Sequence, residues 1–223
     1  MPKIIAVIPA YNEEKMIGEV VRETKKYVSE VIVVDDASED STAQIAKAEG
    51  AQVYQHIINR GVGGALGTGF KAALQKQADI IVMLDADGQH DPASIPALIS
   101  PIQKNMADAT LGSRFLKNQK IPYLRKIYNK LGNFATRLLF GVKTTDSQSG
   151  MRAFSRQALG LIDLKTNRME VCSELIKEIG QKKIKMIEVP IKAIYTEYSL
   201  SKGQNLLNGF KTFVKLIFLK TMK

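Results

Sequence analysis

The sequence predicts an α/β fold built on a mostly parallel, doubly wound sheet. Short, continuous apolar runs over residues 4–8, 31–34 and 80–84 have the length and β-branched content of strands that are buried on both faces. Between them, residues 13–27, 39–49 and 64–77 carry apolar side chains at helical spacing. Strands that alternate with helices in this way join through right-handed crossovers, so their carboxyl ends share one edge of the sheet. We expect ligands to bind at that edge.

The remaining elements are weaker in the sequence. Residues 52–57 and 109–112 complete the strands of the first half. The second half is less regular, with a basic helix predicted over 121–140, a short strand over 151–154, a helix over 170–180, a strand over 185–194 and an amphipathic helix over 205–219. Pro190 predicts a sheet edge or a bulge for its strand, because proline cannot donate a ladder hydrogen bond. Because no repeat, low-complexity tract or Gly/Ser linker occurs, we expect one domain over residues 1–204, with halves at about 1–112 and 113–204, and a separate basic helix over 205–223.

Charge is unevenly distributed along the chain. The 223 residues include 32 Lys and Arg and 22 Asp and Glu, for a net charge of +10. Residues 1–110 hold 10 basic and 15 acidic residues, whereas residues 111–223 hold 22 basic and 7 acidic residues. We therefore expect the second half to contact an anionic partner. A nucleic acid is disfavoured, because the first half is acidic, Trp is absent and no recognition motif occurs.

Cysteine content and hydropathy indicate the compartment. A single cysteine, Cys172, excludes an internal disulfide and is typical of a reducing compartment such as the cytoplasm. The apolar run at residues 4–8 is too short for a signal peptide, and no run approaches the roughly 20 apolar residues of a membrane-spanning helix. We expect a cytoplasmic protein without a membrane span.

Polar clusters follow three of the predicted strands, over residues 9–13, 35–40 and 85–91. Carboxylates gathered in one crevice repel one another unless a cation lies among them. Asp85 and Asp87, two positions apart on a turn, can share one hard divalent ion such as Mg²⁺ or Mn²⁺, with phosphate and water as its other ligands. The alternative is a simple turn at a strand end. A calcium loop is excluded, because Pro96 stands where that loop requires its last glutamate.

Asp35 suits a nucleoside, because a carboxylate at a strand end can hydrogen-bond a base amide edge or a ribose hydroxyl. Capping of the helix that follows is assigned instead to Ser38 or Asp36.

The segment over residues 59–69 is rich in glycine but lacks the dinucleotide-binding fingerprint. Counted from Gly61, Leu66 stands where Gly or Ala is required, and no Gly-Lys-Ser/Thr follows. Two interpretations remain. The glycines give a helix a small-residue face for close backbone approach, or Arg60 and residues 61–64 line a nucleotide-sugar crevice at a helix N-terminus.

These clusters, taken with three later motifs, resemble glycosyltransferase family 2, and within it the dolichyl-phosphate mannosyltransferase and polyprenyl-phosphate glycosyltransferase group. The motifs lie at residues 9–13, 34–42, 85–92, 112–114, 146–154 and 198–202. The resemblance runs from about residue 3 to residue 202. It implies a GT-A type fold, a nucleotide-diphosphate sugar donor and an inverting transfer.

The resemblance also implies roles for particular residues. With two residues of the glycine-rich segment, the expected nucleotide-sugar site consists of Pro9, Tyr11, Asn12, Glu13, Asp35, Arg60, Gly64, Asp85, Ala86 and Asp87. The implied metal ligands are Asp85, Asp87 and Gln89. Arg114, Arg125 and Lys202 would bind the phosphate of a lipid acceptor, and Asp87, Arg114 and Lys202 would carry the catalysis.

The expected reaction moves a sugar from the nucleotide diphosphate to a polyprenyl phosphate. The divalent ion and Lys202 would stabilise the charge of the leaving diphosphate. An acceptor phosphate is already anionic and needs only arginines to position it. A saccharide hydroxyl would need a carboxylate base instead, for which Glu174 and Asp146 are candidates, although Glu174 also suits an exposed helix residue paired with Lys177. A non-catalytic nucleotide-sugar-binding protein is a further alternative.

Basic and large apolar residues alternate over residues 117–143 and 206–223. Basic amphipathic helices of this kind lie in the headgroup plane of anionic membranes. We expect peripheral contact with the cytoplasmic face of the membrane. The alternatives are that these apolar faces pack on the core or form the seam of a homodimer.

Overall fold

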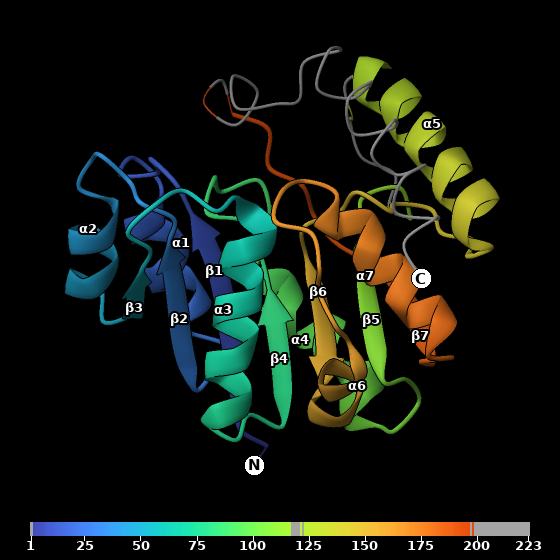
Figure 1. Cartoon of the computed structure of the whole chain (residues 1–223), viewed down its shortest axis with the longest axis horizontal. Coiled ribbons are helices and arrows are strands. Elements are labelled where there is room, and N and C mark those ends of the chain that lie inside the picture. Colours follow the sequence, from blue (N-terminus) through green and yellow to red (C-terminus); the bar gives the residue numbers. More distant parts are fainter. Residues whose placement is uncertain (1, 117–120, 122, 197, 199–223) are drawn as a thin grey trace.

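The computed structural model describes residues 2–116, 121, 123–196 and 198, and these form a seven-stranded sheet with helices on both faces (Figure 1). The strand order is β3-β2-β1-β4-β6-β5-β7, and all neighbours are parallel except β6, which is antiparallel to β4 and β5. The strands are β1 (Ile4–Ala10), β2 (Glu30–Asp35), β3 (Gln52–Gln55), β4 (Ile80–Met83), β5 (Ala109–Ser113), β6 (Arg152–Ser155) and β7 (Met186–Pro190). The expected α/β class and mostly parallel sheet are confirmed.

Two layers of helices sandwich the sheet. The helices are α1 (Ile17–Thr24), α2 (Thr42–Ala48), α3 (Val62–Gln75), α4 (Ile95–Gln103) after a short 3₁₀ turn (Pro92–Ser94), α5 (Tyr123–Phe140), α6 (Arg156–Leu161) and α7 (Val171–Gln181). One core, under α3, α6 and α7, includes Val7 and Val34, and the other, under α1, α2 and α4, includes Ile8 and Val33. The central strands bury both faces, which is why they are continuous apolar runs in the sequence.

α5 lies apart from these two layers. In Figure 1 it stands beyond the edge where the parallel strands end, which we call the carboxyl edge, and it packs against α7. Among the described residues, no helix has both the length and the apolar character that crossing a membrane requires.

The predicted elements are found, with shifted ends. The helix expected over 13–27 begins at Ile17, because the carbonyl of Glu13 closes a turn with the amides of Met16 and Ile17. The helix expected over 39–49 begins at Thr42, whose amide donates to Asp40 Oδ1 at 3.0 Å, so neither Ser38 nor Asp36 caps it.

The strand that contains Pro190 lies at the end of the sheet, where its one neighbour is β5, so the prediction of an edge strand is confirmed. Two helices, α4 and α6, were not predicted. Prolines at positions 96 and 101 obscure α4, although its buried residues Ile95, Leu98, Ile99 and Ile102 keep helical spacing. The helix predicted over 205–219 lies outside the described residues.

Candidate active site

The loops that follow β1 and β2 interlock at the carboxyl edge. Asn12, in the left-handed region at φ 52°, donates its amide to Ser38 Oγ at 2.9 Å and accepts the amide of Glu39 on its side-chain oxygen at 2.9 Å. The amide of Glu13 donates to Thr42 Oγ1 at 2.8 Å. The convergence of these loops, which the parallel topology predicted, is confirmed. It brings the half-exposed ring of Tyr11 to the same edge as Asp35, because Ala10 and Asp35 are register partners.

Asp35 is buried, and other side chains fix its carboxylate. Oδ1 accepts a hydrogen bond from Ser38 Oγ, and Oδ2 accepts one from Gln55 Nε2 at 3.2 Å. Ser38 therefore orients Asp35 rather than capping α2. A carboxylate held in one orientation at this edge is suited to hydrogen-bond a nucleoside.

Asp36 has a role that the sequence did not reveal. Its carboxylate accepts the amides of Arg60 at 2.9 Å and Gly61 at 2.6 Å, and it contacts His56 Nδ1 at 2.7 Å. These bonds fix the loop that leads into α3. The positive φ of Gly61, 83°, is part of the same turn.

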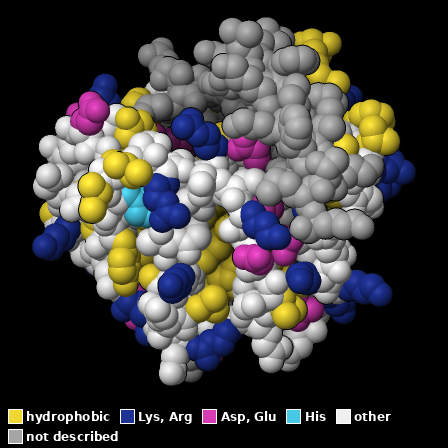
Figure 2. All heavy atoms as spheres, in the orientation of Figure 1, with side chains coloured by type: hydrophobic (Ala, Val, Ile, Leu, Met, Phe, Trp, Pro, Cys, Tyr) yellow, Lys and Arg dark blue, Asp and Glu magenta, His cyan; other side chains and the backbone are white. Residues whose placement is uncertain are grey.

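The glycines at the start of α3 allow the helix to pack closely against the backbone of residues 166–167. The amides of Gly63 and Gly64 donate to the carbonyl of Asn167 at 2.9 and 3.2 Å, and a Cβ on Gly63 would overlap the carbonyl of Thr166. Arg60 and Gly64 line an open groove of about 470 Å³ that runs along α3 on the face shown in Figure 2. The lining of this groove contains none of the carboxylates at the carboxyl edge, so a role for Arg60 and Gly64 in nucleotide-sugar binding stays a prediction.

Asp85 lies at the end of β4 in a closely fitted position. His90 Nε2 is 3.3 Å from Asp85 Oδ2, and Gly150 approaches so closely that a Cβ there would overlap the Asp85 carboxylate. Burial raises the pKa of Asp85, but the His90 hydrogen bond and the charges of Arg114 and Arg152 outweigh it and hold the pKa below its usual value. Asp85 is therefore an anion at neutral pH.

Asp87 lies two residues after Asp85, in the same loop, and contacts Gln89. Asp87 Oδ1 accepts the amide of Gln89 at 2.9 Å, and Oδ2 accepts Gln89 Nε2 at 2.9 Å. Gly88, at φ 73°, allows the turn. Burial, reinforced by the charge of Asp85, raises the pKa of Asp87 to about 6. The predicted repulsion between gathered carboxylates is therefore seen in the pKa of Asp87, whereas neighbouring cations lower the pKa of Asp85.

The donor set at this turn fits a hard divalent ion. Two carboxylates and the amide oxygen of Gln89 are the oxygen ligands that Mg²⁺ or Mn²⁺ prefers. Among the described residues, no cluster of three or more His, Cys, Asp or Glu side chains could enclose an ion. An ion held here would therefore need ligands from a substrate or from water.

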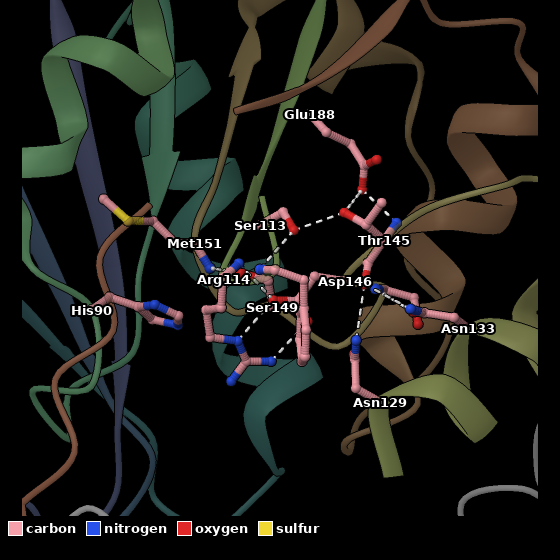
Figure 3. A network of polar contacts seen from close by, with 12 residues as sticks. His90, Ser113, Arg114, Asn129, Asn133, Thr145, Asp146, Ser149, Met151 and Glu188 are labelled. Carbon is pink, nitrogen blue, oxygen red and sulfur yellow. Dashed lines mark hydrogen bonds and ion pairs between the residues drawn. The ribbon is translucent and has the colours of Figure 1, made fainter. Parts of the chain in front are cut away.

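Arg114, directly after β5, is held by Asp146 (Figure 3). Arg114 Nε and its backbone amide donate to Asp146 Oδ2 at 2.7 and 3.0 Å, and Nη2 donates to Oδ1 at 2.8 Å. Burial lowers the pKa of Arg114, but the hydrogen bond and charge of Asp146 reverse this and raise the pKa above its ordinary value. Arg114 is a permanent, oriented cation, and its charge acts on Asp85.

Both carboxylates considered as a general base have structural partners instead. Asp146 is fully buried and has both oxygens bound to Arg114. Glu174 is 2% exposed rather than exposed, and it accepts the amides of Lys165 at 2.9 Å and Thr166 at 3.0 Å together with the hydroxyl of Thr166. The alternative of an exposed Glu174 does not hold, because its carboxylate is buried and anchors the loop that packs on α3.

The segment after β7 crosses the carboxyl edge toward β1. The amide of Ile194 donates to the carbonyl of Gln89 at 2.8 Å, and Tyr198 donates its hydroxyl to Glu13 Oε2 at 2.8 Å. The motif that contains Lys202 thus begins beside the loop after β1. Lys202 itself and the side chain of Arg125 lie outside what the structure describes, so their assignments stay predictions.

Comparison with known proteins identifies the family. The family model described as Glycosyl transferase family 2 matches residues 5–161. The chain belongs to glycosyltransferase family 2. This glycosyltransferase is 43% identical to a UDP-N-acetylglucosamine–dolichyl-phosphate N-acetylglucosaminyltransferase of Methanococcus voltae, over 99% of this chain and 97% of that protein. It is 34% identical to an undecaprenyl-phosphate mannosyltransferase of Micrococcus luteus, over 73% of this chain and 70% of that protein.

The fold of this family-2 glycosyltransferase is shared by a solved structure. Glucosyl-3-phosphoglycerate synthase from Mycobacterium tuberculosis, in complex with Mn²⁺, uridine diphosphate and phosphoglyceric acid, matches with a TM-score of 0.75 and 19% identity, covering 99% of this chain and 79% of that one. The expected GT-A type fold is confirmed.

Proposed function

We propose that this glycosyltransferase moves a sugar, with inversion, from a nucleotide-diphosphate sugar to a polyprenyl phosphate. The proposal rests on two groups of opposite charge at the carboxyl edge. The Asp85–Asp87 turn suits the donor, and the oriented cation Arg114 suits an anionic acceptor. The two relatives described above are named for dolichyl-phosphate and undecaprenyl-phosphate acceptors. The oriented cation and the names of these relatives both support a phosphate group as the acceptor.

The residues divide the reaction between them. Asp35 and Tyr11 would hold the nucleoside, while Asp85, Asp87 and Gln89 would hold Mg²⁺ or Mn²⁺, which offsets the charge of the diphosphate when bound. Arg114 would orient the acceptor phosphate so that its oxygen attacks the anomeric carbon opposite the leaving diphosphate. That oxygen is already anionic, so no proton has to be removed. The structural use of Asp146 and Glu174 supports this route over transfer to a hydroxyl, which needs a base.

A transfer assay tests the proposal. With Mn²⁺ and a nucleotide sugar, we expect a polyprenyl-phosphate sugar to form, and we expect none when the matching polyprenol without phosphate replaces the acceptor. Mass spectrometry of the lipid fraction identifies the product, and parallel reactions with uridine and guanosine donors identify the nucleotide. Transfer to the polyprenol or to a saccharide hydroxyl would show that the acceptor assignment is wrong.

We also propose that α5 rests on the membrane that holds the acceptor. Large apolar side chains, 36–76% exposed, form a stripe on this helix, which we call the α5 outer face: Tyr123, Ile127, Leu131, Phe134 and Leu138. Exposed basic residues flank it: Lys126, Lys130 and Arg137. An apolar stripe bordered by cations suits an anionic bilayer, which would place the enzyme at the cytoplasmic membrane face.

Replacing Leu131 and Phe134 together with glutamate should weaken binding to vesicles of phosphatidylcholine and phosphatidylglycerol by about tenfold or more. The variant loses two apolar side chains that would enter the bilayer, and the two glutamates are repelled by the anionic surface. Co-sedimentation measures the effect. Leu161→Glu is the matched control, since Leu161 is 55% exposed on α6, away from this face, and its replacement should change nothing. If vesicle binding persists and a dimer of the wild type dissociates instead, the α5 outer face is a dimer seam.

A further inference from the structure

Two asparagines join α5 to the loop that contains Asp146. Asn129 Nδ2 and Asn133 Nδ2 both donate to the carbonyl of Thr145, at 2.8 and 2.7 Å, and Asn133 Oδ1 accepts the amide of Ser147 at 2.8 Å (Figure 3). The two asparagines are four residues apart and so share one face of the helix. At 100° per residue, that face is opposite the α5 outer face.

We call residues 144–150 the Asp146 loop. From the sheet side, Glu188 Oε1 accepts the amide and the hydroxyl of Thr145 at 2.6 and 2.9 Å, and Arg152 Nη2 donates to the carbonyl of Ser147 at 2.8 Å. These bonds come from β7 and β6. The bonds from α5 fall on the residues immediately before and after Asp146, so the placement of α5 bears directly on the carboxylate that orients Arg114.

The contact between α5 and the Asp146 loop is polar. Among the α5 side chains that the structure describes, the buried ones are Asn129, Ala135 and Thr136, two of which are polar. Several buried oxygens along the contact have no hydrogen-bond partner: Asn129 Oδ1, Thr136 Oγ1, Thr144 Oγ1 and Ser147 Oγ. Directional hydrogen bonds therefore join the helix to the loop, and such bonds transmit a small displacement of the helix to the loop.

We propose that Asn129 and Asn133 are positioning residues that couple the seating of α5 on an anionic bilayer to the orientation of Arg114. The path is short: the α5 outer face, the two asparagines, the backbone of Thr145 and Ser147, the Asp146 carboxylate and the Arg114 guanidinium. Through this path, contact of α5 with the bilayer holds Arg114 in place. The enzyme is then ready to bind the acceptor when it lies on the membrane that contains the lipid phosphate. This inference rests on the proposed function and adds to it a dependence on the membrane.

Kinetics on vesicles test the coupling. We expect Asn133→Ala to raise the KM for polyprenyl phosphate by about tenfold while kcat and the KM for the nucleotide sugar change less than twofold, because the loss falls on acceptor binding. Asn129→Ala should have a smaller effect in the same direction, since it removes one hydrogen bond rather than two. Thr136→Val is the matched control on the same side of α5: its hydroxyl has no partner, so its removal should leave both KM values unchanged.

A double-mutant cycle separates positioning from general destabilisation. In an Arg114→Ala background, Asn133→Ala should have no further effect on the dissociation constant for polyprenyl phosphate, measured by equilibrium binding on vesicles, because the cation it positions is gone. If the effects of Arg114→Ala and Asn133→Ala on acceptor binding add in full, the inference is wrong. The isosteric Asn133→Asp, which keeps the acceptor for Ser147 but loses the donor to Thr145, should reproduce the acceptor defect if the alanine variant folds poorly.

Hydrogen exchange gives a readout that does not depend on turnover. In the wild type, anionic vesicles should slow exchange at the amides of Arg114 and Ser147, and in Asn133→Ala they should not, even though the variant sediments with vesicles as before. Equal protection in both proteins would also overturn the inference. A wild type that shows this protection yet transfers no sugar to polyprenyl phosphate would instead contradict the proposed function, so the two failures are distinguishable.

Discussion

Asp87→Asn should reduce kcat/KM by roughly 1000-fold or more and, at the same time, make the metal-free protein more stable. The loss of activity, equivalent to about 4 kcal/mol, follows if Asp87 holds the ion that offsets the diphosphate charge. The gain in stability follows from the pKa of Asp87, which is raised to about 6 in the folded protein. Above that pH the Asp87 carboxylate is charged in both states, but the charge is unfavourable only in the folded protein. Asparagine removes this charge and so stabilises the folded state.

The substitution preserves the local hydrogen bonds. The side-chain oxygen of the introduced asparagine would still accept the amide of Gln89, and the Gln89 side chain can rotate its amide so that its oxygen accepts from the new Nδ2. Urea unfolding at pH 7.5 without metal should therefore show an increase of about 1–3 kcal/mol in the free energy of unfolding. Isothermal titration should show loss of Mn²⁺-dependent nucleotide binding. In the wild type, Mn²⁺ affinity should fall as the pH drops below about 6, because protons compete for Asp87, and the variant should lack this dependence.

Asp79→Asn is the matched control for this variant. Asp79 stands just before β4, at the opposite end of the strand from Asp85 and Asp87, where it accepts the amide of Lys3 at 2.7 Å. Its substitution should leave metal binding and kcat/KM unchanged. Full activity in Asp87→Asn with Mn²⁺ bound as before would show that this turn does not hold the metal.

The sequence predicts the parts of the site that depend on periodicity. Runs such as residues 4–8 are apolar throughout because β1 and β2 are buried on both faces, and this pattern requires parallel strands covered by helices. Once the strands are parallel, their carboxyl ends must meet. The convergence of Tyr11, Asp35 and Asp85 was therefore predictable without any knowledge of side-chain contacts.

What the sequence could not predict are the partners of buried carboxylates, because those partners lie far away along the chain. Asp36 binds the amides of Arg60 and Gly61, and Asp146 binds Arg114. In each case the pairing depends on which loops the sheet order brings together, and no local pattern encodes it. Ser38 was a milder difficulty, since serine often caps helices, whereas here its hydroxyl donates to Asp35 and the amide of Thr42 donates to Asp40.

Asp146→Asn should lower the free energy of unfolding by about 3–5 kcal/mol and abolish measurable transfer to the lipid phosphate. The variant removes the carboxylate that binds the buried Arg114 guanidinium, and removing one partner of a buried ion pair costs more than the net value of the pair. Arg114 would also lose the carboxylate that orients it, so its phosphate-binding geometry would be lost together with its stability. Urea unfolding and the vesicle transfer assay measure the two effects.

A double variant shows whether the buried pair serves stability or function. Replacing Arg114 with methionine and Asp146 with leucine removes both charges, and apolar pairs of this kind are often as stable as the ion pairs they replace. We therefore expect the double variant to recover most of the free energy of unfolding that Asp146→Asn loses, while transfer to polyprenyl phosphate stays absent. Recovery of activity along with stability would mean that Arg114 is a structural residue and that another cation binds the acceptor. Recovery of stability alone would mean that the pair is retained because a rigid, permanent cation is needed at the carboxyl edge.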